Sequence, residues 1–331
     1  MMQEPKLLCL LPEEYVCTPD GMEIDQEGNL ILSCPNFADM SMPSCICKID
    51  TQGNVTKWFD VPVSQVTGDA RAMGIAYGPD WDLYIVDNQG WSGDEKLVFQ
   101  GRIIRVRMNG DVVEKVTEVA TGMEHPNGIR VNGDYVYVTQ SMLSKEKTES
   151  GNLLSCVYRF KLDDENIQIT NTLADPNILV TYETYNPDDQ YGMDGIVFDK
   201  EGNMYVGNFG DGEIFKVSFN PDGSIKENVS FAKDPANLRS VDGLSIDEYG
   251  NLYAADFVVN AIAKIDPTGK VTRIAQSPDT DGLNGELDQP GEPCVWNGKI
   301  AVSCFDLVTG GDKVNTGHEL PATMSLLEIE P

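Results

Sequence analysis

The residues best suited to chemistry stand at the start of a repeated motif. The stretches MDGIVFDKEGNMYVGNF at 193–209 and VDGLSIDEYGNLYAADF at 241–257 agree in pattern along their whole length, and each carries an Asp-Gly pair at its second position. Four weaker copies occur elsewhere, and five of the six starting residues have an oxygen in the side chain. Carboxylate and amide oxygens are ligands of hard cations such as Ca²⁺. The six starting residues are Asp20, Met73, Asn127, Asp194, Asp242 and Glu292.

The spacing of the copies predicts the elements that position these residues. Consecutive starts are 48 to 67 residues apart, and each copy reads as a hairpin, for example 195–199 and 203–207 joined by a Gly-containing turn. Helical periodicity is nearly absent. Four short strands in each unit of about 50 residues are typical of a propeller blade. We therefore predict an all-β, six-bladed β-propeller that forms a single domain over residues 1–331.

The two ends of the chain are predicted to close this ring, because an open ring would leave sheet edges unpaired. After Glu292 only about three strands fit, the last in MSLLEIE at 324–330. The apolar segment KLLCLL at 6–11 precedes the first copy and has no sheet of its own. We expect residues 6–11 to complete the last blade as its outer strand.

In a propeller the first strand of each blade lines the central channel, so the six starting residues should form a ring at one end of it. We call this set the channel ring. Its four carboxylates would repel one another unless they are protonated or bind a cation. The ring contains no Cys or His, which argues against zinc, and Ca²⁺ tolerates irregular oxygen geometry better than Mg²⁺ does. The prediction is a site for Ca²⁺ or another divalent cation.

A structural alternative exists for the same motif. Asp-Gly and Asn-Gly are common turn formers, and we assign Asp199 and Asp247, at the opposite end of their hairpins, to turns alone. This alternative does not explain why the starting position remains oxygen-bearing at Glu292, where the next residue is Pro293.

The motifs PNGI at 126–129, MDGI at 193–196 and VDGL at 241–244 resemble those of the senescence-marker-protein/gluconolactonase/luciferin-regenerating-enzyme family, to which diisopropyl fluorophosphatase and paraoxonase are more distantly related. The resemblance implies one catalytic divalent cation, usually Ca²⁺. Two ligands would depart from the family pattern, since Asp20 replaces a Glu and Asp194 replaces an Asn. The ligands implied by position are Asp20, Asn127, Asp194 and Asp242.

The second strand of each hairpin returns to the end of the channel where the ring lies, so residues at the ends of these strands should border a pocket. The loops beyond them are long in blades one, two, three and six, and long loops on a rigid scaffold often carry function. Apolar residues in these loops, such as Phe37 and Trp91, indicate a partly apolar wall. The predicted substrate-binding residues are Met73, Asn88, Asn208, Phe209, Asp256 and Phe257.

Three functions fit this arrangement. The first is a metal-dependent hydrolase, most simply a lactonase or esterase for a small molecule, with Asp242 as both ligand and general base. The second is a propeller lyase or a condensing enzyme similar to strictosidine synthase, with Glu292 in acid–base catalysis. The third is a propeller that binds a ligand without catalysis. The acidic ring favours the enzymes.

Composition limits the partners and the compartment. Lys plus Arg number 24 against 53 Asp plus Glu, a formal charge of −29 that repels phosphate backbones and anionic lipids. We therefore expect a small-molecule substrate, no nucleic acid, no membrane, and a monomer or small homo-oligomer. Eight cysteines without a C-x-x-C pair, and an N-terminus without a basic leader, indicate a cytoplasmic protein.

One further acidic stretch, SPDTDGLNGELD at 277–288, has the composition of a calcium-binding loop. It begins with Ser277 and has no flanking helices, so the sequence alone predicts no site there.

Overall fold

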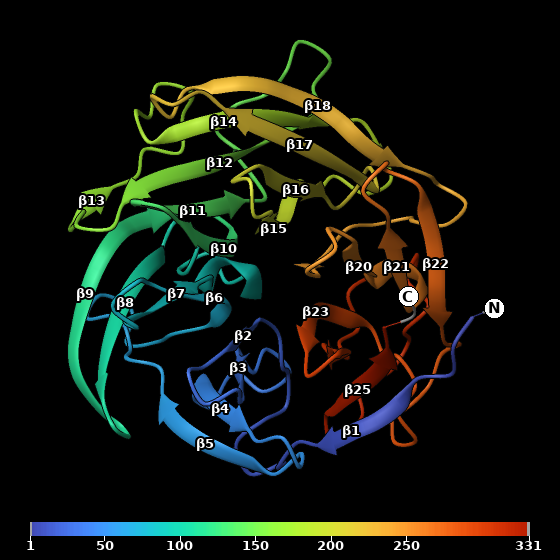
Figure 1. The fold of residues 1–331 in the computed structure, drawn as a ribbon. Coiled ribbons are helices and arrows are strands. Elements are labelled where there is room, and N and C mark those ends of the chain that lie inside the picture. Colours follow the sequence, from blue (N-terminus) through green and yellow to red (C-terminus); the bar gives the residue numbers. More distant parts are fainter. Residues whose placement is uncertain (1, 330–331) are drawn as a thin grey trace.

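The chain forms six antiparallel sheets arranged around a central axis, and in each of them four strands make up a blade (Figure 1). The computed structural model describes residues 2–329. The fold class predicted from the repeats is confirmed: within the described residues the only helices are two short 3₁₀ turns, η1 (Gln89–Ser92) and η2 (Phe257–Val259). No helix among the described residues combines the length and the apolar character that a membrane span needs.

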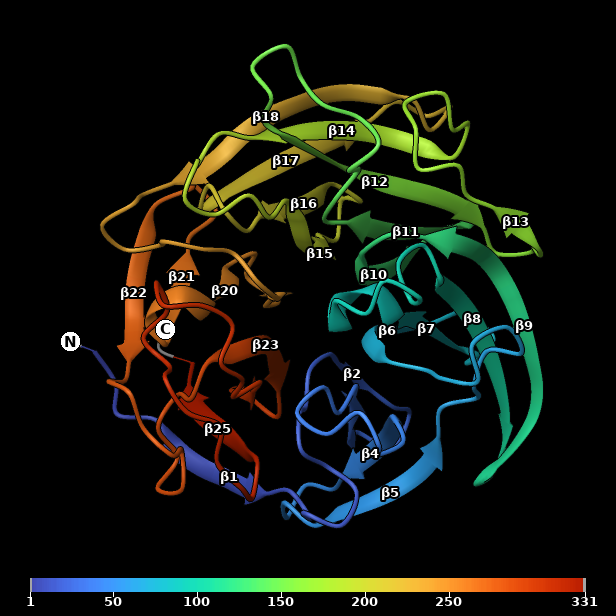
Figure 2. The same cartoon turned by 180° about the vertical axis from the view of Figure 1, so that it is seen from behind.

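The first strand of each blade lies next to the axis and the last strand lies at the perimeter (Figures 1 and 2). Blade one comprises β2 (Met22–Ile24), β3 (Leu30–Cys34), β4 (Cys45–Ile49) and β5 (Val55–Asp60). Blade two comprises β6 (Ala72–Tyr77), β7 (Leu83–Asp87), β8 (Gly101–Asn109) and β9 (Val112–Met123). Blade three comprises β10 (Pro126–Asn132), β11 (Tyr135–Gln140), β12 (Leu153–Lys161) and β14 (Ile178–Thr184).

The second half of the ring repeats this arrangement. Blade four comprises β15 (Met193–Phe198), β16 (Met204–Asn208), β17 (Glu213–Phe219) and β18 (Ile225–Lys233). Blade five comprises β19 (Leu244–Ile246), β20 (Leu252–Asp256), β21 (Ala261–Ile265) and β22 (Val271–Gln276). Blade six comprises β23 (Pro290–Trp296), β24 (Lys299–Cys304), β25 (Thr323–Glu328) and β1 (Lys6–Leu10).

The longest interval between two copies, from 127 to 194, contains an element that the repeat did not predict. The short strand β13 (Ile167–Gln168), in the connection between β12 and β14, pairs in parallel with β9 and adds a fifth strand to blade two. This strand covers the part of the outer edge of blade two at Ala120 and Thr121, and so shortens its unpaired edge.

Blade six closes the ring as predicted. Strand β1 pairs antiparallel with β25, with Lys6 opposite Leu326 and Leu10 opposite Thr323. The first strand of the chain therefore lies beside its last strand, as the blue and red ribbons of Figure 1 show. Of the predicted segment 324–330, residues up to Glu328 belong to β25, and Glu330 lies outside the described residues.

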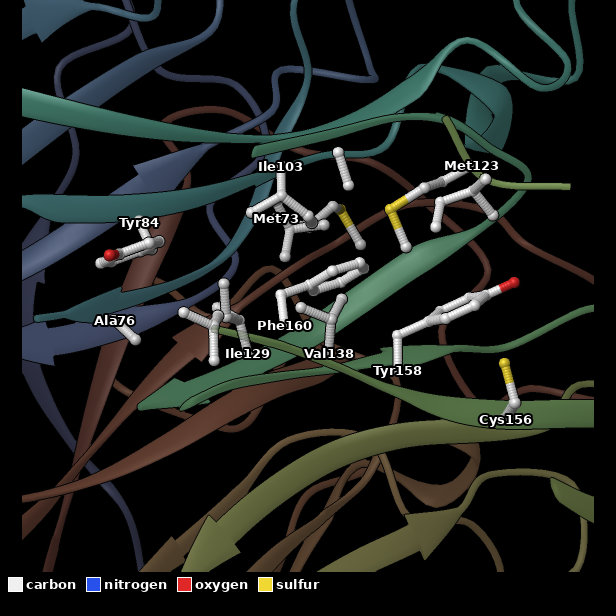
Figure 3. Close-up of a cluster of buried hydrophobic side chains, with 14 of the residues drawn as sticks. Met73, Ala76, Tyr84, Ile103, Met123, Ile129, Val138, Cys156, Tyr158 and Phe160 are labelled. Carbon is white, nitrogen blue, oxygen red and sulfur yellow. The ribbon is translucent and has the colours of Figure 1, made fainter. Parts of the chain in front are cut away.

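The hydrophobic core is divided among the interfaces between neighbouring blades. Between blades two and three, Met73 and Ile103 on one sheet pack with Ile129, Val138 and Phe160 on the next, all of them buried (Figure 3). Inner strands are covered on both faces, so they are apolar almost continuously, as in Leu83–Asp87. Each blade therefore depends on its neighbours for burial.

Around the axis the first strands of neighbouring blades lie so close together that five blades require a glycine, which has no Cβ, at the point of contact. A Cβ on any of the five glycines would lie closer than 3.0 Å to backbone of the following blade, and none of the five has a positive φ. Close approach of backbone, and not turn formation, is therefore the structural reason for the Asp-Gly and Asn-Gly pairs. The five glycines, each directly after a residue of the channel ring, are Gly21, Gly74, Gly128, Gly195 and Gly243.

Hydroxyl groups on the second strands tie these blades together. Thr139 Oγ1 accepts a hydrogen bond from Gly128 N at 2.7 Å and donates one to Asp194 O of the next blade at 2.6 Å. Ser303 Oγ donates to Asp20 O at 2.6 Å across the closing junction, and Ser33 Oγ donates to Met73 O. The carbonyl groups of the channel ring are thereby fixed by neighbouring blades.

We expect deletion of residues 1–11 to destabilise the protein, because it exposes the edge of β25 and removes the buried Leu11. Loss of a single buried leucine side chain costs about 2–5 kcal/mol, and the deletion should exceed this. Thermal unfolding followed by circular dichroism measures the effect, with deletion of residues 1–2 as the control. An unchanged melting temperature would refute the role of β1 in closure.

We expect Gly195→Ala to lower the free energy of unfolding by about 1–3 kcal/mol, because its Cβ would meet Asp242 O and Leu244 N, which are backbone atoms and cannot rotate away. Gly311→Ala is the matched control, since nothing lies within 4 Å of a Cβ at that position. Chemical denaturation of both variants checks the prediction, and equal stability of the two would contradict it.

Candidate functional site

A cavity of about 190 Å³ lies at the end of the channel where the first strands begin. Its floor contains residues of the channel ring, its wall is largely aromatic, and its rim carries polar side chains from loops. The lining residues are Asp20, Met73, Asn127, Asp194 and Asp242 on the floor; Trp91, Tyr191, Phe209, Phe257 and Phe305 in the wall; and Asp189, Thr309 and Lys313 at the rim.

The structure brings all four predicted cation ligands into this one cavity. Asn127 and Asp194 lie at the starts of β10 and β15, while Asp20 and Asp242 stand two residues before β2 and β19. Asp20, Asn127 and Asp194 are buried, and Asp242 is partly exposed. Each side chain therefore projects toward the axis from the point where a different blade begins.

The three carboxylates on the floor have no cationic partner. No Lys or Arg of the described residues forms an ion pair with Asp20, Asp194 or Asp242. Burial, and then repulsion from the neighbouring carboxylates, raises the pKa of Asp194 and of Asp242 well above the ordinary value. Burial and Glu292 raise the pKa of Asp20 in the same way.

Glu292 is the exception in the channel ring. Its Oε1 accepts a hydrogen bond from Arg130 Nη2 at 2.7 Å, and Glu292 does not line the cavity. Arg130 lies deeper in the channel, where its guanidinium also contacts the carbonyl oxygens of Ile75 at 3.4 Å and Leu244 at 3.5 Å. Burial raises the pKa of Glu292 and Arg130 lowers it, so this carboxylate is offset by a fixed charge. The sequence placed Glu292 in the same ring as the predicted ligands but did not predict Arg130.

The remaining residues fit a divalent cation. Asn127 Nδ2 donates to Tyr191 Oη at 3.4 Å, and no described donor bonds its Oδ1, which is left for an ion. Three carboxylates and an amide oxygen match the preference of Ca²⁺ for oxygen ligands. The oxygens of Asp20, Asp194 and Asp242 do not all lie within 4.8 Å of one another, so an ion bound by all of them requires a small contraction of the ring or a bridging water.

Aromatic rings form a nearly continuous band above the floor. Trp91 contacts Phe37 with ring centroids 4.5 Å apart, and further contacts connect Phe305, Phe257, Phe209 and Tyr191 at centroid distances of 5.4–6.3 Å. We call this set the aromatic band. Phe209, Phe257 and Phe305 directly follow the second strand of three different blades, and Phe37 lies three residues after the second strand of blade one. The band makes the wall of the cavity apolar directly above its acidic floor.

Of the predicted substrate-binding residues, the structure places Met73, Phe209 and Phe257 in the cavity and excludes the other three. Asn208 and Asp256 are fully buried, where Asn208 bonds Thr184 and Glu183 and Asp256 accepts hydrogen bonds from Arg239 and Ser240. Successive side chains of a strand point to opposite sides, so only one residue of each Asn-Phe or Asp-Phe pair can face the cavity.

Asn88 is also buried and outside the cavity, although it occupies the band position of blade two. Neither its Oδ1 nor its Nδ2 has a hydrogen-bond partner. In the structure Trp91 of the following 3₁₀ turn η1, and not Asn88, stands in the wall of the cavity.

Sequence reasoning missed the polar residues that come from loops outside the repeat. Tyr191 precedes β15, and its hydroxyl lies close enough to Asp194 and Asp242 for both charges to raise its pKa, after burial. Lys313, in the long loop between β24 and β25, forms an ion pair with Asp189 at 3.4 Å across the rim. These loops have no counterpart in other blades, so alignment of the copies could not place them.

In chelator-treated protein we expect Asp194→Asn to be stabilising, and increasingly so as the pH rises from 5 to 8. A raised pKa means that the folded protein retains a proton that the unfolded chain releases, so stability falls as pH rises above the ordinary Asp pKa of about 3.9. Each pH unit between that value and the folded-state pKa is worth about 1.4 kcal/mol.

Melting temperatures of wild type and Asp194→Asn at several pH values, with EDTA and with Ca²⁺, check this expectation. Ca²⁺ should stabilise wild type more than the variant, because only the folded wild type offers the full ligand set. A variant that is less stable than wild type at pH 8 in EDTA would show that the Asp194 carboxylate is compensated by the protein itself.

Part of the chain matches the model of a known protein family. Residues 85–238 match the model of the SMP-30/Gluconolactonase/LRE-like region. This segment contains Asn127 and Asp194, whereas Asp20 and Asp242 lie outside it. A search of curated proteins gave no match.

Solved structures share the fold over nearly the full length. A gluconolactonase from Xanthomonas campestris has 17% identity, a TM-score of 0.58, and coverage of 98% of this chain and 95% of that chain. The calcium-binding protein regucalcin from Agrobacterium tumefaciens has 13% identity, a TM-score of 0.61, and coverage of 99% and 94%. A streptogramin B lyase has 12% identity, a TM-score of 0.56, and coverage of 99% and 97%.

At these identities the likeness shows the fold, and one fold hosts several chemistries. The chain is a six-bladed propeller whose residues 85–238 match the SMP-30/Gluconolactonase/LRE-like region, and this match confirms the resemblance carried by its PNGI and MDGI motifs.

Proposed function

We propose that this protein is a divalent-cation-dependent hydrolase that opens a small-molecule lactone or a related ester. The observation that carries the proposal is the set of three carboxylates without a counter-charge, placed with Asn127 at the floor of an apolar-walled cavity. Such a site needs a cation if its carboxylates are to be stable in the ionised form. The cation would lie at the floor of the cavity, where it meets the innermost part of a bound substrate. Ca²⁺ is the ion we favour, because all ligands are oxygens.

When bound, a divalent cation polarises an ester carbonyl and offsets the negative charge that develops on its oxygen. Asp242 would accept the proton of the attacking water, because it is the one of the three acidic residues on the floor that is not fully buried. Tyr191 accepts a hydrogen bond from the amide nitrogen of Asn127, which leaves the amide oxygen for the cation. The aromatic band excludes bulk water from the reacting group.

The wall indicates the kind of substrate. Five aromatic rings and Met73 line the cavity, so the acyl part or the leaving group of the ester should carry an apolar or aromatic body. The polar rim, with Thr309 and the Lys313–Asp189 pair, lies where a polar substituent would remain near solvent. We place the protein in the cytoplasm, because all eight cysteines are free and seven of them are buried.

A lyase remains the second candidate, because the fold is shared with a streptogramin B lyase. Hydrolysis and elimination can be separated by their products. Hydrolysis in water labelled with oxygen-18 introduces the label into the product acid, whereas elimination does not. A screen of aromatic and aliphatic lactones, phosphotriesters and acyl esters, each with Ca²⁺ and with chelator, provides the substrate for this test.

We expect Asp242→Asn to lower kcat by roughly 10²–10⁴ while metal is retained, because the amide still offers an oxygen ligand but cannot accept a proton. Glu292→Gln is the matched control: it also replaces a carboxylate of the channel ring by an amide, but outside the cavity, and should change kcat by less than roughly tenfold. Metal content by mass spectrometry and folding by circular dichroism accompany both assays. If Glu292→Gln abolishes activity and metal-loaded Asp242→Asn does not, the hydrolase mechanism is wrong and the lyase or condensing reaction takes its place.

A further inference from the structure

A second acidic cluster lies in blade six, away from the channel ring. It combines the loop between β22 and β23 with the long loop between β24 and β25. Carboxylate oxygens of Asp288, Asp306 and Glu319 all lie within 4.8 Å of one another. Asp288 and Asp306 are only 1% and 2% exposed, whereas Glu319 is at the surface. We call these three residues the blade-six cluster.

The deepest member of the cluster lacks a partner. Asp288 Oδ1 is buried and has no hydrogen bond. Asp306, by contrast, accepts hydrogen bonds from Glu319 N at 2.8 Å and Asn315 Nδ2 at 3.3 Å. A buried carboxylate oxygen without a donor costs several kcal/mol unless it is protonated or bound to a cation. The cluster therefore contains an oxygen that the protein itself does not satisfy.

The charges of the cluster are compensated only in part. No Lys or Arg of the described chain forms an ion pair with any of the three carboxylates, and the one basic contact is His318 Nδ1, at 3.3 Å from Asp306 Oδ2. Asp279 and Asp281 add negative charge nearby. Burial, followed by Asp306 and Glu319, raises the pKa of Asp288 to about 8.

Two neutral oxygens next to the cluster are unpartnered as well. Thr323 Oγ1 is buried without a hydrogen bond and lies beside Asp288, since both flank Gly282. Asn315, whose amide nitrogen bonds Asp306, has a buried Oδ1 without a partner. Carboxylate, hydroxyl and amide oxygens together form the ligand chemistry of a hard divalent cation.

We propose that the blade-six cluster is a second divalent-cation site, for Ca²⁺ or an ion of similar chemistry, with Asp288, Asp306 and Glu319 as its ligands. Part of it comes from the stretch 277–288, whose calcium-loop composition pointed to no site by itself, because Asp306 and Glu319 follow it at a distance in the chain.

The site has a structural consequence for the cavity. Asp306 and Glu319 stand near the two ends of the loop that carries Thr309 and Lys313 to the rim, and Val314 N of this loop bonds Val258 O at 2.9 Å. Because Asp288 belongs to the connection between β22 and β23, an ion bound by all three ties the rim loop to the junction of blades five and six. This inference does not depend on the reaction catalysed at the channel ring.

The test uses the full chain, stripped with chelator and then titrated with Ca²⁺. Native mass spectrometry should show that Asp288→Asn and Glu319→Gln each bind one ion fewer than wild type. Asp281→Asn is the matched control, since it removes one charge from the same region but lies outside the cluster and is exposed. The proposal is overturned if Asp288→Asn and Glu319→Gln bind as many ions as wild type.

Hydrogen exchange separates this site from the channel ring. We expect Ca²⁺, at a concentration 100 times its dissociation constant, to slow those amides of residues 306–322 that exchange only when the ion is released. The slowing should reach about 100-fold in wild type, in Asp281→Asn and in the ring variant Asp194→Asn. The slowing should be lost in Asp288→Asn and in Glu319→Gln, a surface substitution that leaves the core intact. Equal slowing in wild type and Glu319→Gln would contradict the proposal, whatever the outcome at the ring.

Discussion

The close approach of six first strands around one axis is the constraint on which the rest of the molecule depends. The backbone of each of five blades comes so near to the next that only glycine fits after the ring residue. Hydroxyls of Ser33, Thr139 and Ser303 then tie carbonyl groups of neighbouring blades together. The same geometry that closes the ring places one side chain of every blade at the end of the channel. A narrow, rigid ring of side chains is therefore a consequence of closure.

Crowding decides the electrostatics of this ring. Four carboxylates at the end of a narrow channel cannot all remain ionised without positive charge. The protein supplies one positive charge in Arg130, which is placed deeper in the channel and paired with Glu292. It leaves Asp20, Asp194 and Asp242 unpaired at the cavity floor. This division assigns Glu292 to the interior of the channel and leaves the other three for a cation. The aromatic band strengthens the effect, because it keeps water from the same carboxylates.

The loops add what the repeated blades cannot supply. Every blade has the same hairpin, but the rim of the cavity takes Asp189 and Lys313 from connections that occur once in the chain. The long loop of blade six carries the rim residues Thr309 and Lys313 and two acids of the blade-six cluster. Its position is therefore coupled to charges outside the cavity. A rigid scaffold with one adjustable rim is well suited to changing substrates while the floor stays the same.

The sequence by itself determined the number of blades, the closure by residues 6–11, the five residues of the channel ring that line the cavity and the aromatic positions Phe209 and Phe257. All of these follow from periodicity, because a residue at one place in the repeat takes the equivalent place in each blade. Asp199 and Asp247 were also placed correctly in turns, where each accepts hydrogen bonds from nearby backbone groups. Only the tertiary structure decided that Glu292 pairs with Arg130, that Asn88, Asn208 and Asp256 face away from the cavity, and that Tyr191 and Lys313 reach it. The physical reason is that these contacts join segments far apart in the chain, and their side-chain directions depend on how neighbouring blades and loops pack.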